Sequence, residues 1–366
     1  MRVLITGVSG FAGSHLADYL LTRPGLELWG AALTTHRPDY LSPAVRLLAV
    51  DLRDPEAVQR LIQAVQPEQV YHLAGQAFVP QSRQDPWDTL ETNLKPQVNL
   101  FQALSRERLR PRILIVSSYE VYAGLAPRKG PVDEAWPLGP DSPYGVSKVA
   151  QEFFARLYFE EHDLPVVRAR PFNHIGPRQS TRFVAAAFAS QVACIQAGVS
   201  PAVIKVGNLA ARRDFSDVRD IVRAYVLLLE QGAPGEVYNL GAGRSYAIRE
   251  LLDRLLAFAG VDCDIQIDPE RYRPLTVPDV VCDASRARAA CGWQPLISLD
   301  QTLAELLAYE RGRLVEEQGF STAESAENAE KTEKISAHSP GTSVRGRCAN
   351  SAVEPDLPRS DHWLPH

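Results

Sequence analysis

Short apolar runs alternate with helical patterns through the first half of the chain, and this alternation limits the possible folds more than any other feature. The strand-like runs are Arg2–Thr6, Glu27–Ala32, Arg46–Val50, Gln69–Leu73 and Arg112–Ser117. The helical patterns are Phe11–Leu21, Glu56–Val65 and Thr89–Glu107. Strands that alternate with helices pair in parallel through right-handed crossovers. The sequence therefore predicts an α/β fold with a doubly wound parallel sheet.

The pattern changes after the helix Lys148–His162 and the strand Pro165–Arg170. The later elements are Phe183–Ala197, Ala202–Val206, Val218–Glu230, Glu236–Leu240, Ile248–Ala259 and Leu299–Val315. We expect a first domain over 1–172, with later strands returning to its sheet from about 202–241, and a smaller C-terminal α+β region over 173–317. Residues 318–366 are polar and lack an apolar period, which predicts a disordered tail.

Composition excludes several classes of protein. The net charge of −5 leaves no basic surplus for binding nucleic acid, and no apolar run approaches the roughly 20 residues that span a bilayer. The five cysteines are scattered and never form a CxxC pair, so we expect neither a disulfide framework nor a metal site. A cytoplasmic protein with reduced thiols is the resulting prediction.

Three glycines follow the first strand and open the first helix, in the order Gly7, Gly10 and Gly13. The first permits a tight turn, the second lets the backbone approach a pyrophosphate, and the third allows close packing of helix on strand. The N–H groups of the first helical turn, which includes Phe11 and Ala12, would hold the phosphates. This arrangement predicts a dinucleotide site on a Rossmann-type fold.

The identity of the dinucleotide depends on the end of the second strand. NAD-binding proteins tend to have an acidic residue there, whereas this chain has Thr34, Thr35 and Arg37, which suit a 2′-phosphate. We therefore predict NADP, with NAD as the alternative. Further predicted cofactor contacts follow the third and fourth strands, at Asp51, Leu52, Leu73, Ala74 and Gly75.

Tyr144 and Lys148 form a Tyr-x-x-x-Lys pair, which places both side chains on one face of a helix. An ammonium beside a phenol should lower the pKa of the phenol and make the tyrosine a usable acid or base. Both residues also serve as predicted cofactor contacts. Ser118 follows the fifth strand, at the sheet edge where open α/β sheets bind ligands, and would hydrogen-bond the reacting oxygen.

Together these motifs resemble the extended short-chain dehydrogenases/reductases that act on nucleotide sugars, over residues 1 to about 312. RPFNHIGP at 170–177 and VGNLAARRDF at 206–215 are similar to the GDP-sugar branch, which includes GDP-4-dehydro-6-deoxy-D-mannose reductases and GDP-mannose 4,6-dehydratases. The resemblance implies a Ser118, Tyr144 and Lys148 triad and a homodimer through the helices Thr89–Glu107 and Lys148–His162. It also implies that a GDP-sugar is bound by Asn173, Asn208, Arg213, Arg249 and Arg273.

The reaction has several candidates within that resemblance. A reductase needs one acid to protonate the oxygen at C4, whereas a 4,6-dehydratase also needs a base at C5, for which Glu120 is the candidate. Dehydratases tend to have a small polar or acidic residue at the position of the bulky Tyr119, which favours the reductase. A 4-epimerase could use the same triad, and a non-catalytic dinucleotide sensor is disfavoured because the Tyr–Lys pair is intact.

Overall fold

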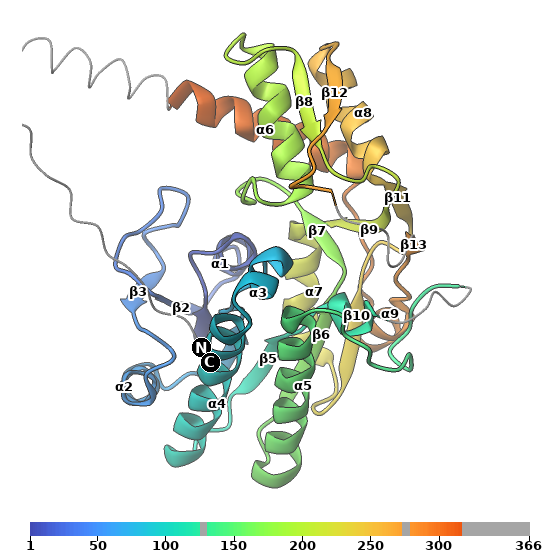
Figure 1. The fold of residues 1–366 in the computed structure, drawn as a ribbon. Helices are drawn as coiled ribbons and strands as arrows, with labels where there is room; N and C mark the ends of the chain where they lie inside the picture. The colour runs from blue at the N-terminus through green and yellow to red at the C-terminus, as the bar shows by residue number, and fades with distance from the viewer. Residues whose placement is uncertain (125–129, 273–278, 317–366) are drawn as a thin grey trace, which may run out of the picture. The chain divides into compact units, whose positions relative to one another are not determined.

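The computed structural model describes residues 1–124, 130–272 and 279–316, and Met1–Val315 form one compact unit. Its centre is a seven-stranded sheet of order β10-β6-β5-β4-β1-β2-β3, in which every neighbouring pair is parallel (Figure 1). The strands are β1 (Arg2–Thr6), β2 (Glu27–Ala32), β3 (Arg46–Ala49), β4 (Gln69–His72), β5 (Arg112–Val116), β6 (Val166–Pro171) and β10 (Val237–Leu240). The predicted doubly wound parallel sheet is confirmed.

Both faces of the sheet are covered by helices. Val3 and Ile5 point into a core shared with α1 (Phe11–Leu21) and α7 (Val218–Gln231). Leu4, between them, points into the opposite core. That second face is covered by α2 (Pro55–Val65), α4 (Pro86–Arg106) and α5 (Pro143–His162). Side chains alternate across a strand, so burial on both faces explains why the predicted strands are continuous apolar runs.

Three short helices and one early helix start were missed by the sequence patterns. The helices that were not predicted are α3 (Val79–Gln84), the 3₁₀ helix η1 (Tyr119–Tyr122) and α9 (Ser285–Cys291). α5 begins at Pro143 rather than at Lys148, because the Ser142 side chain accepts a hydrogen bond from the Gly145 N–H and caps the helix. Tyr144 and Lys148 therefore both lie on α5, as the Tyr-x-x-x-Lys spacing requires.

The chain leaves the sheet after β6 and returns to it at β10. In between lie β7 (Asn173–Ile175), α6 (Val184–Gln196), β8 (Val203–Val206) and β9 (Arg212–Asp217). β9 pairs with β7, with β11 (Ser245–Ala247) and with β13 (Asp279–Val280), and β8 pairs with β12 (Asp264–Ile267). Of the strands expected to return from 202–241, only β10 joins the main sheet. β8 belongs to the separate two-stranded sheet.

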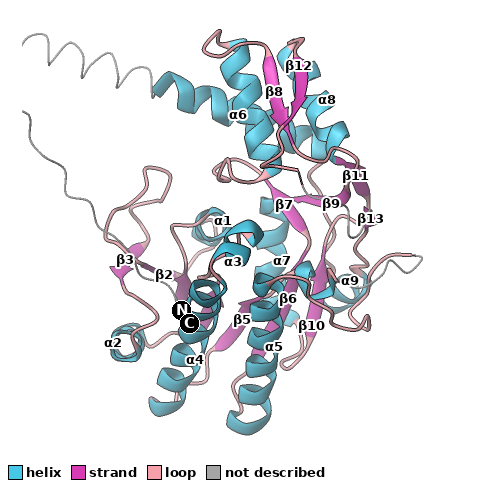
Figure 2. Cartoon of the chain, viewed as in Figure 1, coloured by secondary structure: helices cyan, strands magenta, loops and turns pink. Residues whose placement is uncertain are grey.

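The later elements build a second hydrophobic core. α6 packs on α8 (Ile248–Ala259), and leucines of a final helix over 299–316 join them, while α9 (Ser285–Cys291) packs near β10 and α7 (Figure 2). The second core forms a smaller α+β region, whereas α7, α9 and β10, which also lie within the predicted 173–317, pack with the main sheet. The predicted disordered tail, 318–366, lies outside the described residues. None of the helices in the described ranges is long and apolar enough to cross a membrane.

Candidate active site

The glycine turn forms a tight cradle between β1 and α1. Gly7 has φ +72°, and a Cβ there would lie 2.9 Å from the backbone of Ala74. A Cβ on Gly13 would lie 2.2 Å from the Gly7 carbonyl oxygen, whereas one on Gly10 would lie 3.2 Å from the same atom. Gly10 caps α1 without a side-chain hydrogen bond, which leaves the N–H groups of the first turn, at Phe11 and Ala12, for a ligand. The chain therefore fits a bound pyrophosphate here.

Two other predicted cofactor segments meet this turn. The Ala74 N–H donates to the Thr6 hydroxyl at 3.3 Å, and the same hydroxyl bonds the Nδ1 of buried His72 at 2.9 Å. Leu73, Ala74 and Gly75 thus follow β4 beside the glycine turn. Leu52 is buried, while hydrogen bonds from Arg53 lower the pKa of Asp51.

Arg37, the predicted 2′-phosphate ligand, lies on the loop after β2. Its guanidinium donates to the carbonyl oxygens of Ser42 at 2.5 Å and Val45 at 2.7 Å. Thr34 and Thr35 are exposed on the same loop. Arg37 therefore braces the loop in this structure, and its contact with a 2′-phosphate stays a prediction.

Ser118, Tyr144 and Lys148 are brought together at the carboxyl end of β5. Ser118 is the N-cap of η1, where its Oγ accepts the Glu120 N–H at 3.2 Å, and its hydroxyl hydrogen-bonds the Tyr144 phenol. One turn along α5, the Lys148 Nζ lies 5.7 Å from the centre of the Tyr144 ring. All three side chains are buried. The residues are 30 positions apart or less in sequence, and they converge because α5 packs against η1.

The electrostatics of this trio differ from the prediction. Burial raises the pKa of Tyr144, and the Ser118 hydrogen bond offsets only part of that rise, so the predicted lowering is wrong for this structure. The Lys148 ammonium is instead engaged by the Val116 carbonyl at 2.9 Å and by Gln151 Oε1 at 2.8 Å. Burial lowers the pKa of Lys148 to about 8, and the nearby Glu152 carboxylate opposes this effect.

Glu120 belongs to a second cluster beside the trio. The Tyr119 hydroxyl hydrogen-bonds both Glu120 and Arg213, and its ring stacks on Phe172 with centroids 5.5 Å apart. Burial raises the pKa of the Glu120 carboxyl. Arg213 comes from β9, so this cluster joins the main sheet to the α+β region. Its guanidinium also donates to the Arg212 carbonyl at 2.7 Å.

The other predicted sugar-nucleotide residues are dispersed. Asn173 begins β7, and its Nδ2 is buried without a hydrogen-bond partner among the described residues, which suits a polar ligand. Asn208 uses its Oδ1 to accept the Ala210 N–H at 3.0 Å. Arg249 is exposed on α8 and pairs with Asp253 at 2.7 Å. Arg273 lies outside the described residues.

Gln151 and Asn93 are polar residues of the site that sequence reasoning missed. Both are buried, and Gln151 contacts the Lys148 ammonium directly. Its spacing, three residues after Lys148 on the same helix, was the available signal.

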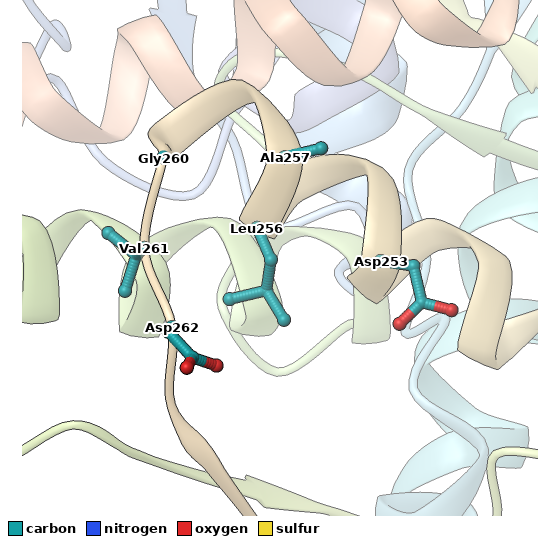
Figure 3. A pocket seen from close by; sticks show the side chains of 6 residues that line it. All are labelled: Asp253, Leu256, Ala257, Gly260, Val261 and Asp262. Atoms are coloured by element: carbon teal, nitrogen blue, oxygen red, sulfur yellow. The ribbon is translucent and has the colours of Figure 1, made fainter.

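A surface hollow elsewhere has no link to this chemistry. It lies at the carboxyl end of α8, where none of the predicted site residues lines it (Figure 3). Its lining residues are Asp253, Leu256, Ala257, Gly260, Val261 and Asp262. Within the described ranges, no group of three or more His, Cys, Asp or Glu side chains is placed to hold a metal ion.

Comparison with known proteins places this geometry in a family. The family model described as GDP-mannose 4,6 dehydratase matches residues 4–306. GDP-6-deoxy-D-mannose reductase from Pseudomonas aeruginosa is 36% identical over 86% of this chain and 99% of its own length. GDP-mannose 4,6-dehydratase from Vibrio cholerae is 29% identical over 84% of this chain and 92% of its own.

Solved structures agree with these sequence matches. The structure of RMD from Pseudomonas aeruginosa, complexed with NADPH, aligns with a TM-score of 0.76 at 35% identity, covering 85% of this chain and 99% of that one. UDP-glucose 4-epimerase from Thermus thermophilus, complexed with NAD, aligns with a TM-score of 0.76 at 32% identity and the same coverage. The predicted resemblance to nucleotide-sugar dehydrogenases/reductases is confirmed. The chain belongs to the GDP-mannose 4,6-dehydratase family.

Proposed function

We propose that this protein is an NADPH-dependent reductase of the C4 ketone of GDP-4-dehydro-6-deoxy-D-mannose. The observation that carries the proposal is the Ser118–Tyr144 hydrogen bond beside the Lys148 ammonium, at the ligand-binding edge of the sheet. The 36% identity to a GDP-6-deoxy-D-mannose reductase, over nearly all of that relative, supports the same reaction.

The glycine turn supplies the cofactor site. The first-turn N–H groups of α1 hold the pyrophosphate, while Ala74 and Gly75 line the approach from β4. When bound, NADPH supplies a hydride to the carbonyl carbon. The relative that was solved with NADPH supports this cofactor, and Arg37 is the residue that would recognise its 2′-phosphate.

Tyr144 is the proton donor. Because burial raises its pKa, the phenol remains protonated at neutral pH, as an acid that acts on a forming alkoxide must be. Ser118 holds the same substrate oxygen through its hydroxyl. Lys148, with a pKa of about 8, is mainly charged at pH 7 and stabilises the phenolate that proton transfer leaves behind.

The substrate lies between these residues and the α+β region. Asn173 provides a buried amide donor for the sugar nucleotide, and Arg213 provides a planar cation that suits its diphosphate. Asn208 and Arg273 are the further candidates in this part of the chain. Arg249 is exposed and already paired with Asp253, so it contributes least to binding of the sugar nucleotide.

A 4,6-dehydratase is the second candidate, because Glu120 lies two residues from Ser118 and its raised pKa suits a proton-transfer group. Two features argue against a free C5 base. The Glu120 carboxyl is bound by Tyr119, and Arg213 lies close enough to attract its charge.

The deciding experiment incubates the purified protein with GDP-mannose alone, and separately with the 4-keto sugar and NADPH. We expect NADPH oxidation only with the keto sugar, and we expect Glu120→Gln to keep most of that rate. Formation of the keto sugar from GDP-mannose without net cofactor consumption, and its loss in Glu120→Gln, would establish the dehydratase instead. Interconversion of C4 epimers without net NADPH consumption would indicate a 4-epimerase.

The proposed enzyme is a cytoplasmic homodimer. Val146, Phe153 and Leu157 are exposed on α5 at 48%, 58% and 41%, with spacings of seven and four residues that form one apolar stripe. Such a stripe beside α4 suits a second copy of the same helices. Light scattering of Phe153→Glu tests the dimer, which should dissociate to a monomer. Among the described residues, Cys194, Cys263, Cys282 and Cys291 form no disulfide bond, which supports a reducing compartment.

A further inference from the structure

The Lys148 ammonium is held by two fixed acceptors inside the protein. Its Nζ donates to the Val116 carbonyl at the end of β5, at 2.9 Å, and to Gln151 Oε1 at 2.8 Å. Lys148 and Gln151 are 7% and 1% exposed. A lysine side chain has four flexible torsions, so two fixed acceptors restrict where its charge can lie. Val116 offers a backbone atom, which makes Gln151 the acceptor that depends on side-chain identity.

The orientation of the Gln151 amide is determined by its second partner. Its Nε2 donates to the Asn93 backbone carbonyl on α4 at 2.8 Å. If the amide turned over, its NH₂ group would face the ammonium and its oxygen would face a carbonyl, so both hydrogen bonds would be lost. The buried site therefore has only one orientation that pairs all four groups, with the amide oxygen toward Lys148.

Asn93 is itself held in place, so the anchor of Gln151 is rigid. Asn93 Oδ1 accepts the Gln76 N–H at 2.7 Å, and its Nδ2 donates to Ser147 Oγ at 2.8 Å. The Ser147 hydroxyl donates in turn to the Tyr144 carbonyl at 2.7 Å. A continuous hydrogen-bonded path thus runs from the loop after β4, through α4, to both ends of the Tyr–Lys pair.

We propose that Gln151 is a positioning residue for the reaction: bridged to the Asn93 carbonyl, it holds the Lys148 ammonium one helical turn from the Tyr144 phenol. The inference rests on the proposed function for its kinetic consequence, but the hydrogen-bonded bridge exists without ligand. Gln151 contacts no reacting atom, and it acts only through Lys148.

Other charged and titratable groups also face Lys148. The Glu152 carboxylate on α5 favours its charged form, and it is held by Arg170 at 2.7 and 2.5 Å. His72 on β4 lies near enough for Lys148 to disfavour its protonation, and Tyr144 lies on the same face of α5. Substitution of uncharged Gln151 leaves all these groups in place, which makes it a cleaner probe than substitution of Glu152.

The test compares Gln151→Met with Gln97→Met. Both replace a buried glutamine between α4 and α5 by a side chain of similar shape, but Gln97 donates only to the Gln151 backbone carbonyl, at 2.8 Å. The chain has only six lysines, so selective ¹³Cε labelling resolves the titration of Lys148 in the protein without ligand. A third variant, Gln151→Glu, keeps the side-chain length and places a carboxyl group against the ammonium.

We expect Gln151→Met to lower the pKa of Lys148 and Gln151→Glu to raise it, with no change in Gln97→Met. In the reductase assay, Gln151→Met should reduce kcat about tenfold and shift the pH profile, while the KM for the keto sugar stays within about twofold. The proposal is overturned if Gln97→Met matches Gln151→Met, or if the folded Gln151→Glu protein leaves the Lys148 titration unchanged.

The two readouts separate this proposal from the proposed function. A shifted Lys148 titration in a protein that does not reduce the keto sugar would contradict the reductase but not the role of Gln151. An active reductase with an unshifted titration would contradict only the role of Gln151.

Discussion

In the glycine turn over residues 7–13 the predicted ligand contacts are backbone N–H groups, whereas over 208–249 the predicted ligand contacts are side chains. The turn has a single workable geometry, because a Cβ on Gly13 would overlap the Gly7 carbonyl oxygen at 2.2 Å. In the other region, Arg213 points toward the Tyr119 and Glu120 cluster, but Arg249 is exposed and paired with Asp253. Two arginines that were both predicted to bind the sugar nucleotide thus have different surroundings.

A site built from glycine backbone can therefore be predicted from a sequence more reliably than a site built from arginine side chains. Where steric exclusion allows only glycine, the residue type alone specifies the backbone. Where an arginine can reach several partners, its role depends on the fold around it. Substitutions at Gly13 test the backbone side of that contrast, and substitutions at Arg213 and Arg249 test the side-chain side.

The largest expected effect concerns Tyr144. Tyr144→Phe removes the proposed proton donor but keeps the ring that packs in the site, so kcat for the keto sugar should fall about 10²–10⁴-fold. The Kd for NADPH, measured by fluorescence quenching, should change little, because the glycine turn is intact and the variant loses only the predicted contact of the Tyr144 hydroxyl with the cofactor. An active Phe variant would mean that another group supplies the proton.

Gly13→Ala tests the backbone-built site directly. Its new Cβ meets a backbone atom that cannot yield, so we expect a Tm lower by several degrees and an NADPH Kd raised more than about tenfold. Gly10→Ala is the matched control, because its Cβ has 3.2 Å to the same oxygen. That variant should weaken NADPH binding with little change in Tm. Equal Tm losses in both variants would show that the turn is adaptable.

Lys148 gives a pH-dependent prediction. Burial lowers its pKa from 10.5 to about 8, so between these pH values the unfolded protein binds more protons than the folded protein. Wild-type stability relative to Lys148→Met should therefore rise as pH increases from about 8 to 10.5, by on the order of 3 kcal/mol. Urea unfolding at a series of pH values measures this change. If the difference in unfolding free energy between wild type and Lys148→Met does not change with pH, the Lys148 ammonium is not buried.

The smallest expected effects are changes in the KM for the keto sugar when Arg213 or Arg249 is replaced. Arg213→Ala should raise the KM for the keto sugar about tenfold, through loss of a charged contact to the diphosphate. Arg249→Ala should change KM less than about twofold, because it loses only an exposed ion pair with Asp253. Steady-state kinetics of the two variants, measured in parallel, test this difference in KM. A larger rise in KM for Arg249→Ala than for Arg213→Ala would contradict it.

Most of the central sheet could be predicted, because its strands are buried on both faces and read as uninterrupted apolar runs. The exception was β8, whose sequence looks like that of a sheet strand although it pairs with β12 instead. Strand partners are chosen by long-range packing, which a local pattern does not record. The start of α5 was missed because Ser142 and Pro143 were not recognised as its cap.

The candidate site also has features that could be predicted from the sequence and features that could not. Ser118, Tyr144 and Lys148 could be predicted to meet, since a strand end and an adjoining helix carry them. The pKa of Tyr144 could not, because it depends on how deeply the phenol is buried. Gln151 was missed because a glutamine has many possible roles until its partners Asn93 and Lys148 are known.

Residues 172–236, which separate β6 from β10 in the sequence, affect how the main sheet forms during synthesis. Val237–Leu240 pair with Arg168–Pro171, so the edge of β6 remains open on the ribosome until the whole intervening stretch has been synthesised. An open edge of this kind is prone to pairing with other chains. A nascent chain that ends near residue 172 therefore has six of the seven strands of the main sheet but an open β6 edge, and it is at risk of aggregation rather than a free-standing nucleotide-binding domain.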